Sequence, residues 1–138
     1  MSTPTPGTPT PRRPVADAEA ADDGLNLVVL RGRVSTPPVL RVLPSGSRLV
    51  TLALRVPTGD STHTSVPVAV WEPAAWVVTT EPDDEIVVTG TVRRRFFQAA
   101  GATGSRVEVQ AAAIGRAGDR RRRAAVARRA RTELTSLD

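Results

Sequence analysis

The chain has 138 residues, which favours one compact domain with tails over two domains that would each need their own core. It contains no Cys, which excludes disulfides and thiolate metal sites, and its formal net charge is +5. No stretch approaches the ~18 apolar residues of a membrane span, and residues 1–24 lack the apolar run of a secretion signal, so we expect a soluble, cytoplasmic protein.

All 19 basic residues are Arg, a planar and permanently charged side chain that can bind phosphate through two parallel hydrogen bonds. The charge is distributed unevenly: the net charge is −2 over residues 1–24, +2 over residues 25–115 and +5 over residues 116–138. A positive charge concentrated in one segment makes the chain a candidate for binding polyanions, which by charge alone could be DNA, RNA or acidic lipid.

Residues 1–24 form the first of three predicted segments. Five prolines fall within the first fourteen positions, and four acidic residues follow among alanines. Such a composition cannot bury enough apolar surface to order a chain. We therefore expect a disordered leader before a folded domain over residues 25–115.

The first predicted strand is Leu25–Val34, rich in Val and Leu, with an end at Ser35–Pro38 where prolines interrupt a ladder. Its side chains alternate between two faces, and both faces begin apolar. Leu27 and Val29 therefore put apolar surface on the outward face, which favours contact between copies of the chain. A turn is predicted at Pro44–Gly46.

Two further strands follow this turn. The stretch Leu49–Val56 alternates as a half-buried strand does and places Arg55 on its outward face. A polar loop is predicted over Pro57–Thr64. The next strand, Ser65–Trp71, carries three valines on one face, so Trp71 points away from them.

The remaining strands come after a segment that could hold a short helix between Pro73 and Pro82. Glu85–Arg95 predicts a fourth strand that ends in three consecutive arginines, and two phenylalanines follow it directly. Gly101–Gly104 has the composition of a hairpin tip, and Arg106–Ile114 predicts a fifth strand. Five short strands with few helices to cover them favour a closed barrel.

Residues 116–138 are rich in Arg and Ala. Asp119 is a candidate N-cap, but eight arginines against three acids leave little apolar face for packing. We expect a basic C-terminal tail that is at most partly helical. An arm of this kind can contact nucleic acid, and a solvated tail explains the composition equally well.

The residues give no support for catalysis. His63 is the single His and has no Cys or second His nearby, so neither a metal site nor a catalytic base is expected there. The acids Asp83–Glu85 follow Pro82, where turn chemistry explains them. We predict no enzymatic activity, no catalytic residue, no metal and no cofactor.

The strands also carry a recognisable succession of short motifs between about Asn26 and Ile114. These are Asn26–Val34, Pro38–Arg41 with Pro44–Gly46, Leu52–Val56, Val68–Trp71, Gly90–Phe97 and Arg106–Val109. In this order and spacing they resemble the bacterial single-stranded DNA-binding protein family, and among its members the Arg-rich actinobacterial branch.

The resemblance implies a five-stranded OB-fold Greek-key barrel, a homotetramer and non-sequence-specific binding and protection of single-stranded DNA in replication, repair or recombination, in the cytoplasm at the nucleoid. Trp71 and Phe97 match positions where the family stacks aromatic rings on bases. Phe96 points the other way along an extended strand and is expected in the core or an interface. The candidate phosphate contacts are Arg33, Arg41, Arg55, Arg93 and Arg95.

The chain departs from the family pattern in three respects, one of which is a connecting helix that is shortened and bounded by prolines. The chain has only two Trp and two Phe, so arginines must carry more of any affinity. Its last residues, 133–138, lack the family's acidic apolar tip, which argues against recruitment of replication proteins through it. Because aromatic residues are sparse, one alternative is a paralogue that regulates another single-strand binder. A second alternative is an RNA-binding OB barrel, because stacking does not read the 2′-hydroxyl.

Overall fold

The computed structural model describes residues 24–137, so the expected disordered leader lies outside the described residues except for Gly24. In chain order the elements are β1 (Val28–Val42), β2 (Arg48–Gly59), β3 (Thr62–Trp71), the 3-10 helix η1 (Ala75–Thr79), β4 (Glu85–Ala99), β5 (Ala102–Arg116) and α2 (Arg120–Thr135). The short helix expected between Pro73 and Pro82 is η1. Within the described range, no helix is long and apolar enough to cross a membrane.

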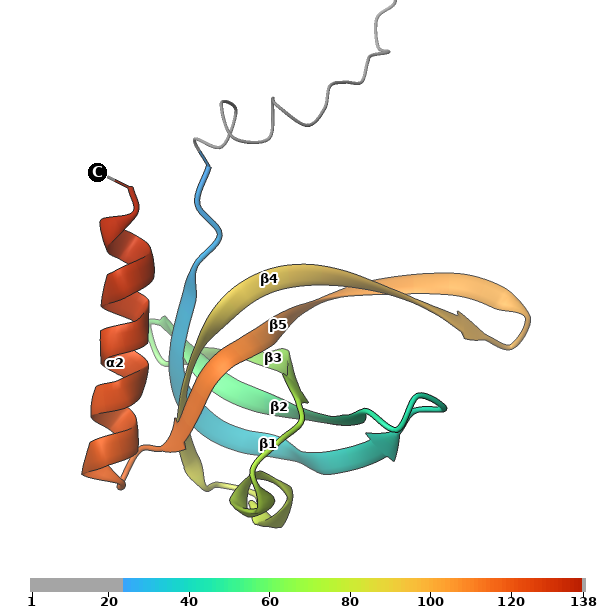
Figure 1. The fold of residues 1–138 in the computed structure, drawn as a ribbon, viewed down its shortest axis with the longest axis horizontal. Helices are drawn as coiled ribbons and strands as arrows, with labels where there is room; N and C mark the ends of the chain where they lie inside the picture. The colour runs from blue at the N-terminus through green and yellow to red at the C-terminus, as the bar shows by residue number, and fades with distance from the viewer. Residues whose placement is uncertain (1–23, 138) are drawn as a thin grey trace, which may run out of the picture.

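The strands close into a barrel in the order β1-β2-β3-β5-β4, which confirms the predicted five-stranded barrel (Figure 1). All neighbouring strands are antiparallel except β3 and β5, which run parallel and share only two residue pairs. Each strand has a partner on both sides, and the barrel is least completely closed between β3 and β5, where the ladder is so short.

The hydrophobic core fills the barrel interior, on the faces that the alternation predicted. Its buried members are Val34, Val50, Leu52, Leu54, Val56, Val68, Val70, Val77, Ile86, Val88 and Val109. Fully burying one such side chain stabilises a fold by about 1.5–3 kcal/mol. The outward face of β1 carries exposed apolar surface, as expected, because Val29 on that face is 54% exposed.

The first strand is longer than predicted. We expected it to end at Ser35–Pro38, but β1 continues through both prolines to Val42. The register with β2 shifts between Val34 and Thr36 and again between Thr36 and Val39, so neither proline has a ladder partner. A bulge tolerates Pro because no ladder hydrogen bond is required there, and this explains why the prolines bend the strand without ending it.

Two hairpins are tighter than predicted. The expected polar loop Pro57–Thr64 is mostly strand, and β2 turns into β3 at Asp60 and Ser61, whose φ angles are +46° and +65°. The tip between β4 and β5 lies at Ala100 and Gly101, with φ angles of +52° and +80°, ahead of the predicted Gly101–Gly104. Two consecutive positive φ angles match the twist of antiparallel strands, which is why such short turns close hairpins.

The C-terminal segment is a helix of 16 residues that packs on the barrel beside β4 and β5 (Figure 1). Asp119 is its N-cap as predicted, and its carboxylate accepts the backbone N–H of Arg122 at 3.1 Å. Val126 is 3% exposed and packs with Val87 and Ala117. The apolar face that we expected to be too small is sufficient because it meets equally small side chains on the barrel.

Val126→Asp is expected to detach α2, since it removes a buried Val contact worth about 1.5–3 kcal/mol and places a charge against Val87. A detached helix of this length is marginal in water, so far-UV circular dichroism should lose helical signal and trypsin should cleave the segment faster. Ala124→Asp, at an exposed position of the same helix, is the matched control and should change neither measurement. Equal behaviour of the two variants would contradict this role of Val126.

Candidate nucleic-acid interface

Two hairpins, β1–β2 and β4–β5, project from one end of the barrel (Figure 1). A hollow lies between them. Its volume is about 480 Å³. The residues that line it are Arg41 from β1, Thr51 from β2, Arg106 from β5, and Arg95, Phe96, Phe97, Gln98 and Ala99 from β4. The structure therefore brings together three of the predicted site residues, Arg41, Arg95 and Phe97.

The pairing of β4 with β5 decides which side chains share a face of the projecting hairpin. Arg95 pairs with Arg106, and Phe97 pairs with Gly104. Directly opposed residues of an antiparallel pair lie on the same side of a sheet, so these two rows form one face. The sequence analysis missed Arg106, although counting back from a two-residue turn at Ala100–Gly101 would have placed it opposite Arg95.

Phe97 rests against the backbone of β5 because Gly104 has no side chain. A Cβ atom at Gly104 would lie 2.7 Å from Cε1 of the Phe97 ring. The ring is nevertheless 40% exposed. An aromatic ring that is supported on one side and open on the other has the geometry of a stacking platform. Phe96, expected in the core or an interface, is 68% exposed, which excludes the core and leaves the interface as the prediction.

The same face carries a buried carboxylate that the sequence analysis also missed. Glu108 is 5% exposed, and its Oε2 accepts hydrogen bonds from Nε and Nη2 of Arg95 at 3.0 and 2.9 Å. Its Oε1 lies 3.7 Å from Nε of Arg106 and has no hydrogen-bond partner within the described part of the chain. Glu108 thus orients both arginines and neutralises part of their charge.

Trp71 lies on the outward face of β3 and is 41% exposed. It pairs with Leu49 of β2, which in turn pairs with Arg41 of β1, so Trp71 and Arg41 are separated by two strand spacings, or about 10 Å. Trp71 does not line the hollow between the hairpins. It lines a second hollow of about 210 Å³ together with residues that include Trp76 and Arg122.

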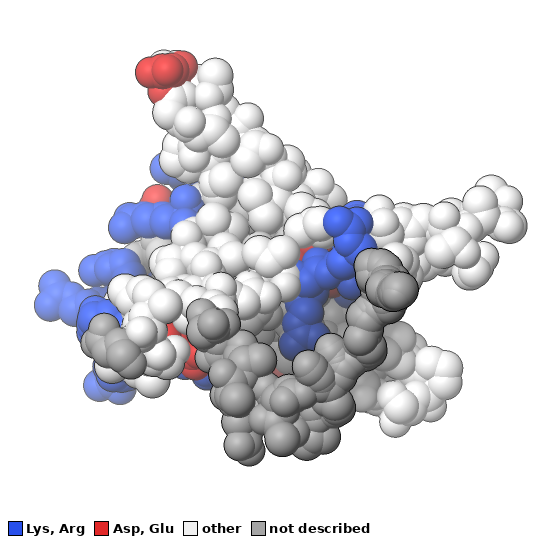
Figure 2. Space-filling model, turned by 90° about the horizontal axis from the view of Figure 1, so that it is seen from above, with Lys and Arg blue, Asp and Glu red and all other residues white. Residues whose placement is uncertain are grey.

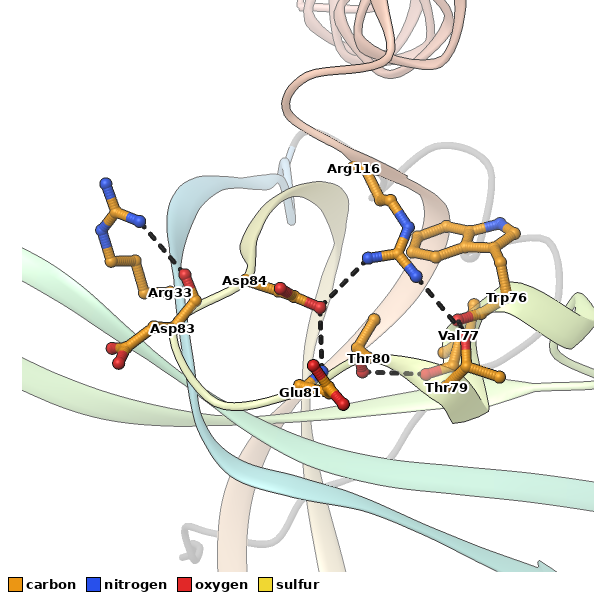
Figure 3. Close-up of polar contacts among 9 residues, drawn as sticks. All are labelled: Arg33, Trp76, Val77, Thr79, Thr80, Glu81, Asp83, Asp84 and Arg116. Atoms are coloured by element: carbon orange, nitrogen blue, oxygen red, sulfur yellow. Dashed lines mark hydrogen bonds and ion pairs between the residues drawn. The ribbon is translucent and has the colours of Figure 1, made fainter.

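The structure does not bring Arg33 and Arg55 to the hollow between the hairpins. They are register partners of β1 and β2, and Arg55 lies six residues beyond Leu49, or about 20 Å along the strand. Nη1 of Arg33 donates to the Asp83 carbonyl at 3.1 Å (Figure 3). Nη2 of Arg55 donates to the Asp83 carboxylate at 3.3 Å. Both guanidiniums are thus engaged with the β3–β4 connection.

Arg93 lies at the base of the projecting hairpin, where it is exposed and pairs in register with Glu108. It does not line the hollow, although it shares the face of Arg95 and Phe97. Figure 2 shows basic side chains gathered in two places, one over α2 and one beside the projecting hairpin. The hairpin tip from residue 98 to residue 105 carries no charged residue. The positive charge of the β4–β5 hairpin therefore lies at its base.

A polar cluster ties η1 to the end of β5 (Figure 3). The carboxylate of Asp84 accepts the backbone N–H of Glu81 at 2.9 Å and Nη1 of Arg116 at 3.1 Å, and these two contacts hold the pKa of Asp84 below its usual range. The guanidinium of Arg116 also lies over the ring of Trp76, 5.2 Å from its centroid. The cluster is occupied by its own hydrogen bonds and ion pairs, and it fixes the position of Trp76. Across residues 24–137, no group of three metal-ligating side chains comes together.

No protein-family model and no curated protein matches this chain. Solved structures do match: the wild-type single-stranded DNA-binding protein from Thermus aquaticus and a deletion mutant of it each show 27% sequence identity and a TM-score of 0.55. Each match covers 67% of this chain and 40% of the Thermus chain, so it spans well under half of that protein. The chain thus has an OB fold similar to that of a single-stranded DNA-binding protein.

Proposed function

We propose that this protein binds single-stranded DNA, without sequence preference, in the hollow between the β1–β2 and β4–β5 hairpins. One observation carries the proposal: an exposed aromatic ring, Phe97, stands among three arginines, Arg41, Arg95 and Arg106, in a single hollow. The similarity to the Thermus single-stranded DNA-binding protein supports it. The finer assignments, to the Arg-rich actinobacterial branch and to DNA replication, repair or recombination at the nucleoid, belong to the same proposal.

The chemistry of the hollow fits a single strand better than a duplex. Stacking of a base on an aromatic side chain is worth about 1–3 kcal/mol and tolerates any sequence, because every base has a π face. In a duplex those faces are already stacked. The guanidiniums can follow the phosphates, and each neutralised phosphate releases counterions. Binding of this kind needs no base-specific hydrogen bond.

Association of several copies is a second part of the proposal. The outward face of β1 presents Val29, which is 54% exposed, beside the partly exposed Leu27. Apolar surface on an outward strand face is typical of contacts between subunits. We propose a homo-oligomer, with a tetramer as the expectation from the family resemblance. Light scattering of the purified protein measures its mass directly.

The test is a titration with oligo-dT at several salt concentrations. If the three arginines each neutralise one phosphate, log K should fall with log salt at a slope of about −2, from about −0.7 per phosphate. Matched RNA and DNA oligomers in competition separate DNA binding from RNA binding. Negligible affinity for either, with co-purification of another single-strand binder, would replace the proposal with the regulatory alternative.

Glu108→Gln is expected to tighten oligo-dT binding about fivefold. The change removes a negative charge beneath Arg95 and Arg106 but keeps an oxygen that can accept from Arg95. Removing one charge near a phosphate changes the interaction by about 1 kcal/mol, which corresponds to that factor. Glu85→Gln makes the same charge change at the ion pair with Arg31, outside the hollow, and should leave the affinity nearly unchanged. Weaker binding by Glu108→Gln would show that orientation of the arginines outweighs their neutralisation.

A further inference from the structure

The second hollow lies where β3 and β5 separate. These strands pair only at Val68 with Val109 and at Ala69 with Gln110, and beyond that point they diverge. The stretch of β5 that follows is Ala111–Ile114, whose three alanines leave space beside the strand. The hollow, which we call the seam hollow, has a volume of about 210 Å³. This is below the ~300 Å³ of the smallest drug-sized pockets, so it accommodates one ring-sized group at most.

Three elements supply the walls of the seam hollow: Trp71 ends β3, Trp76 belongs to η1 and Arg122 lies in the first turn of α2. The guanidinium of Arg122 lies 5.7 Å from the centroid of the Trp76 ring. Arg116 contacts the same ring (Figure 3). The Arg122 side chain is 50% exposed, and its pair with Asp119 is long, at 3.6 Å. Trp76 therefore holds the Arg122 guanidinium at the rim of the hollow, and much of the Arg122 charge remains available to bind an anion.

The seam hollow and the hollow between the hairpins lie on one continuous surface. Thr51, which lines the hollow between the hairpins, pairs with Ala69, two residues before Trp71. Trp71 is thus a diagonal neighbour of Thr51 on the same face, at about 7–8 Å. A strand that leaves Phe97 across Thr51 meets the exposed face of Trp71 next.

We propose that Arg122 of α2, at the rim of the seam hollow, is a further phosphate contact for the same DNA strand, next to a base on Trp71, the position that the family resemblance already assigns to stacking. The inference rests on the proposed function and extends it, because it makes α2 part of the interface. The seam hollow has one carboxylate in its lining, that of Glu72, which accepts the backbone N–H of Arg48 at 3.1 Å. The Glu72 carboxylate repels a phosphate, so the phosphate lies at the Arg122 end of the hollow and the base lies between Glu72 and Arg122.

The test compares Arg122→Ala with Arg128→Ala, binding an oligo-dT of about 16 nucleotides, the upper end of what one OB fold covers. Arg128 is an exposed arginine of the same helix that does not line the seam hollow, so the two variants make the same change in net charge. Arg122→Ala should weaken binding about tenfold and make the salt slope shallower by about 0.7, as loss of one phosphate contact requires. Arg128→Ala should change neither by a comparable amount.

A fluorescence measurement gives an independent readout. In the Trp76→Phe protein, which keeps an aromatic ring beside the arginines, Trp71 is the single Trp. Its emission should be quenched when oligo-dT binds, and adding Arg122→Ala should reduce that quenching. Melting curves of each variant show that the barrel is intact, and Arg122→Gln substitutes if the Ala variant does not fold.

The outcomes separate the two proposals. If Arg122→Ala and Arg128→Ala weaken binding equally while Phe97→Ala weakens it strongly, the seam hollow is not a contact and the proposed function stands. If Trp71 emission is unchanged at saturating oligo-dT, the inference is likewise overturned. If the wild-type protein binds no oligo-dT at all, the proposed function itself fails.

Discussion

Gly90→Ala is expected to lower the melting temperature by about 10 °C or more. A Cβ atom at Gly90 would lie 1.9 Å from the carbonyl oxygen of Gln110 and 3.0 Å from Cα of Ala111, and both are backbone atoms. Backbone cannot rotate away as a side-chain end can, so β4 and β5 would have to separate where the register already shifts. Overpacking of this kind costs about 3 kcal/mol or more of the free energy of unfolding. In a domain of this size that loss lowers the melting temperature by about 10 °C or more.

The control is Gly118→Ala. A Cβ atom there meets nothing within 4 Å, so differential scanning calorimetry should show little change. If the Gly90 variant melts with the control, β4 and β5 do not approach as closely as the structure shows. Gly90 also pairs with Val28 of β1, so a displacement of β4 at Gly90 would disturb the barrel on both sides of β4.

Alternation of side chains predicted the core and the outward faces well, because a closed barrel has a single interior. Leu52 and Leu54 point inward and Trp71 points outward for that reason alone. The positions of turns were harder to predict. Ala100 adopts a positive φ in the β4–β5 turn, which Ala disfavours, so composition pointed to the glycines just after it. An error in the turn shifts the register, and the register decides that Arg106 faces Arg95.

The candidate site could be predicted only in part for a related reason. Alternation assigns a residue to a face but does not place it along the barrel axis, so Arg41 and Arg55 looked equivalent in the sequence. In the structure Arg55 pairs with Asp83, whereas Arg41 lines the hollow between the hairpins. Glu108 was missed because a lone acid in a strand is usually solvated. Its burial depends on Arg95 of the neighbouring strand, a partner 13 positions away that only the hairpin register reveals.

Phe97→Ala is expected to weaken oligo-dT binding by about 5- to 150-fold, the range that corresponds to loss of one base stacked on an aromatic ring. The chain has few aromatic residues to compensate, since it contains only two Trp and two Phe. Fluorescence anisotropy of a labelled oligomer measures the change. Phe97→Trp, which keeps a stacking ring above Gly104, should bind at least as tightly as the wild type.

Phe96→Ala separates stacking from a general loss of apolar surface on the hairpin. Phe96 also borders the hollow and is more exposed than Phe97, at 68% against 40%. It pairs with Ser105, however, and so stands on the face of β4 opposite to Arg95 and Phe97. Its removal should change binding far less. If Phe96→Ala and Phe97→Ala weaken binding equally, the DNA strand does not follow the face formed by Arg95, Arg106 and Phe97. A base stacked on that face would not contact Phe96, which lies on the opposite face.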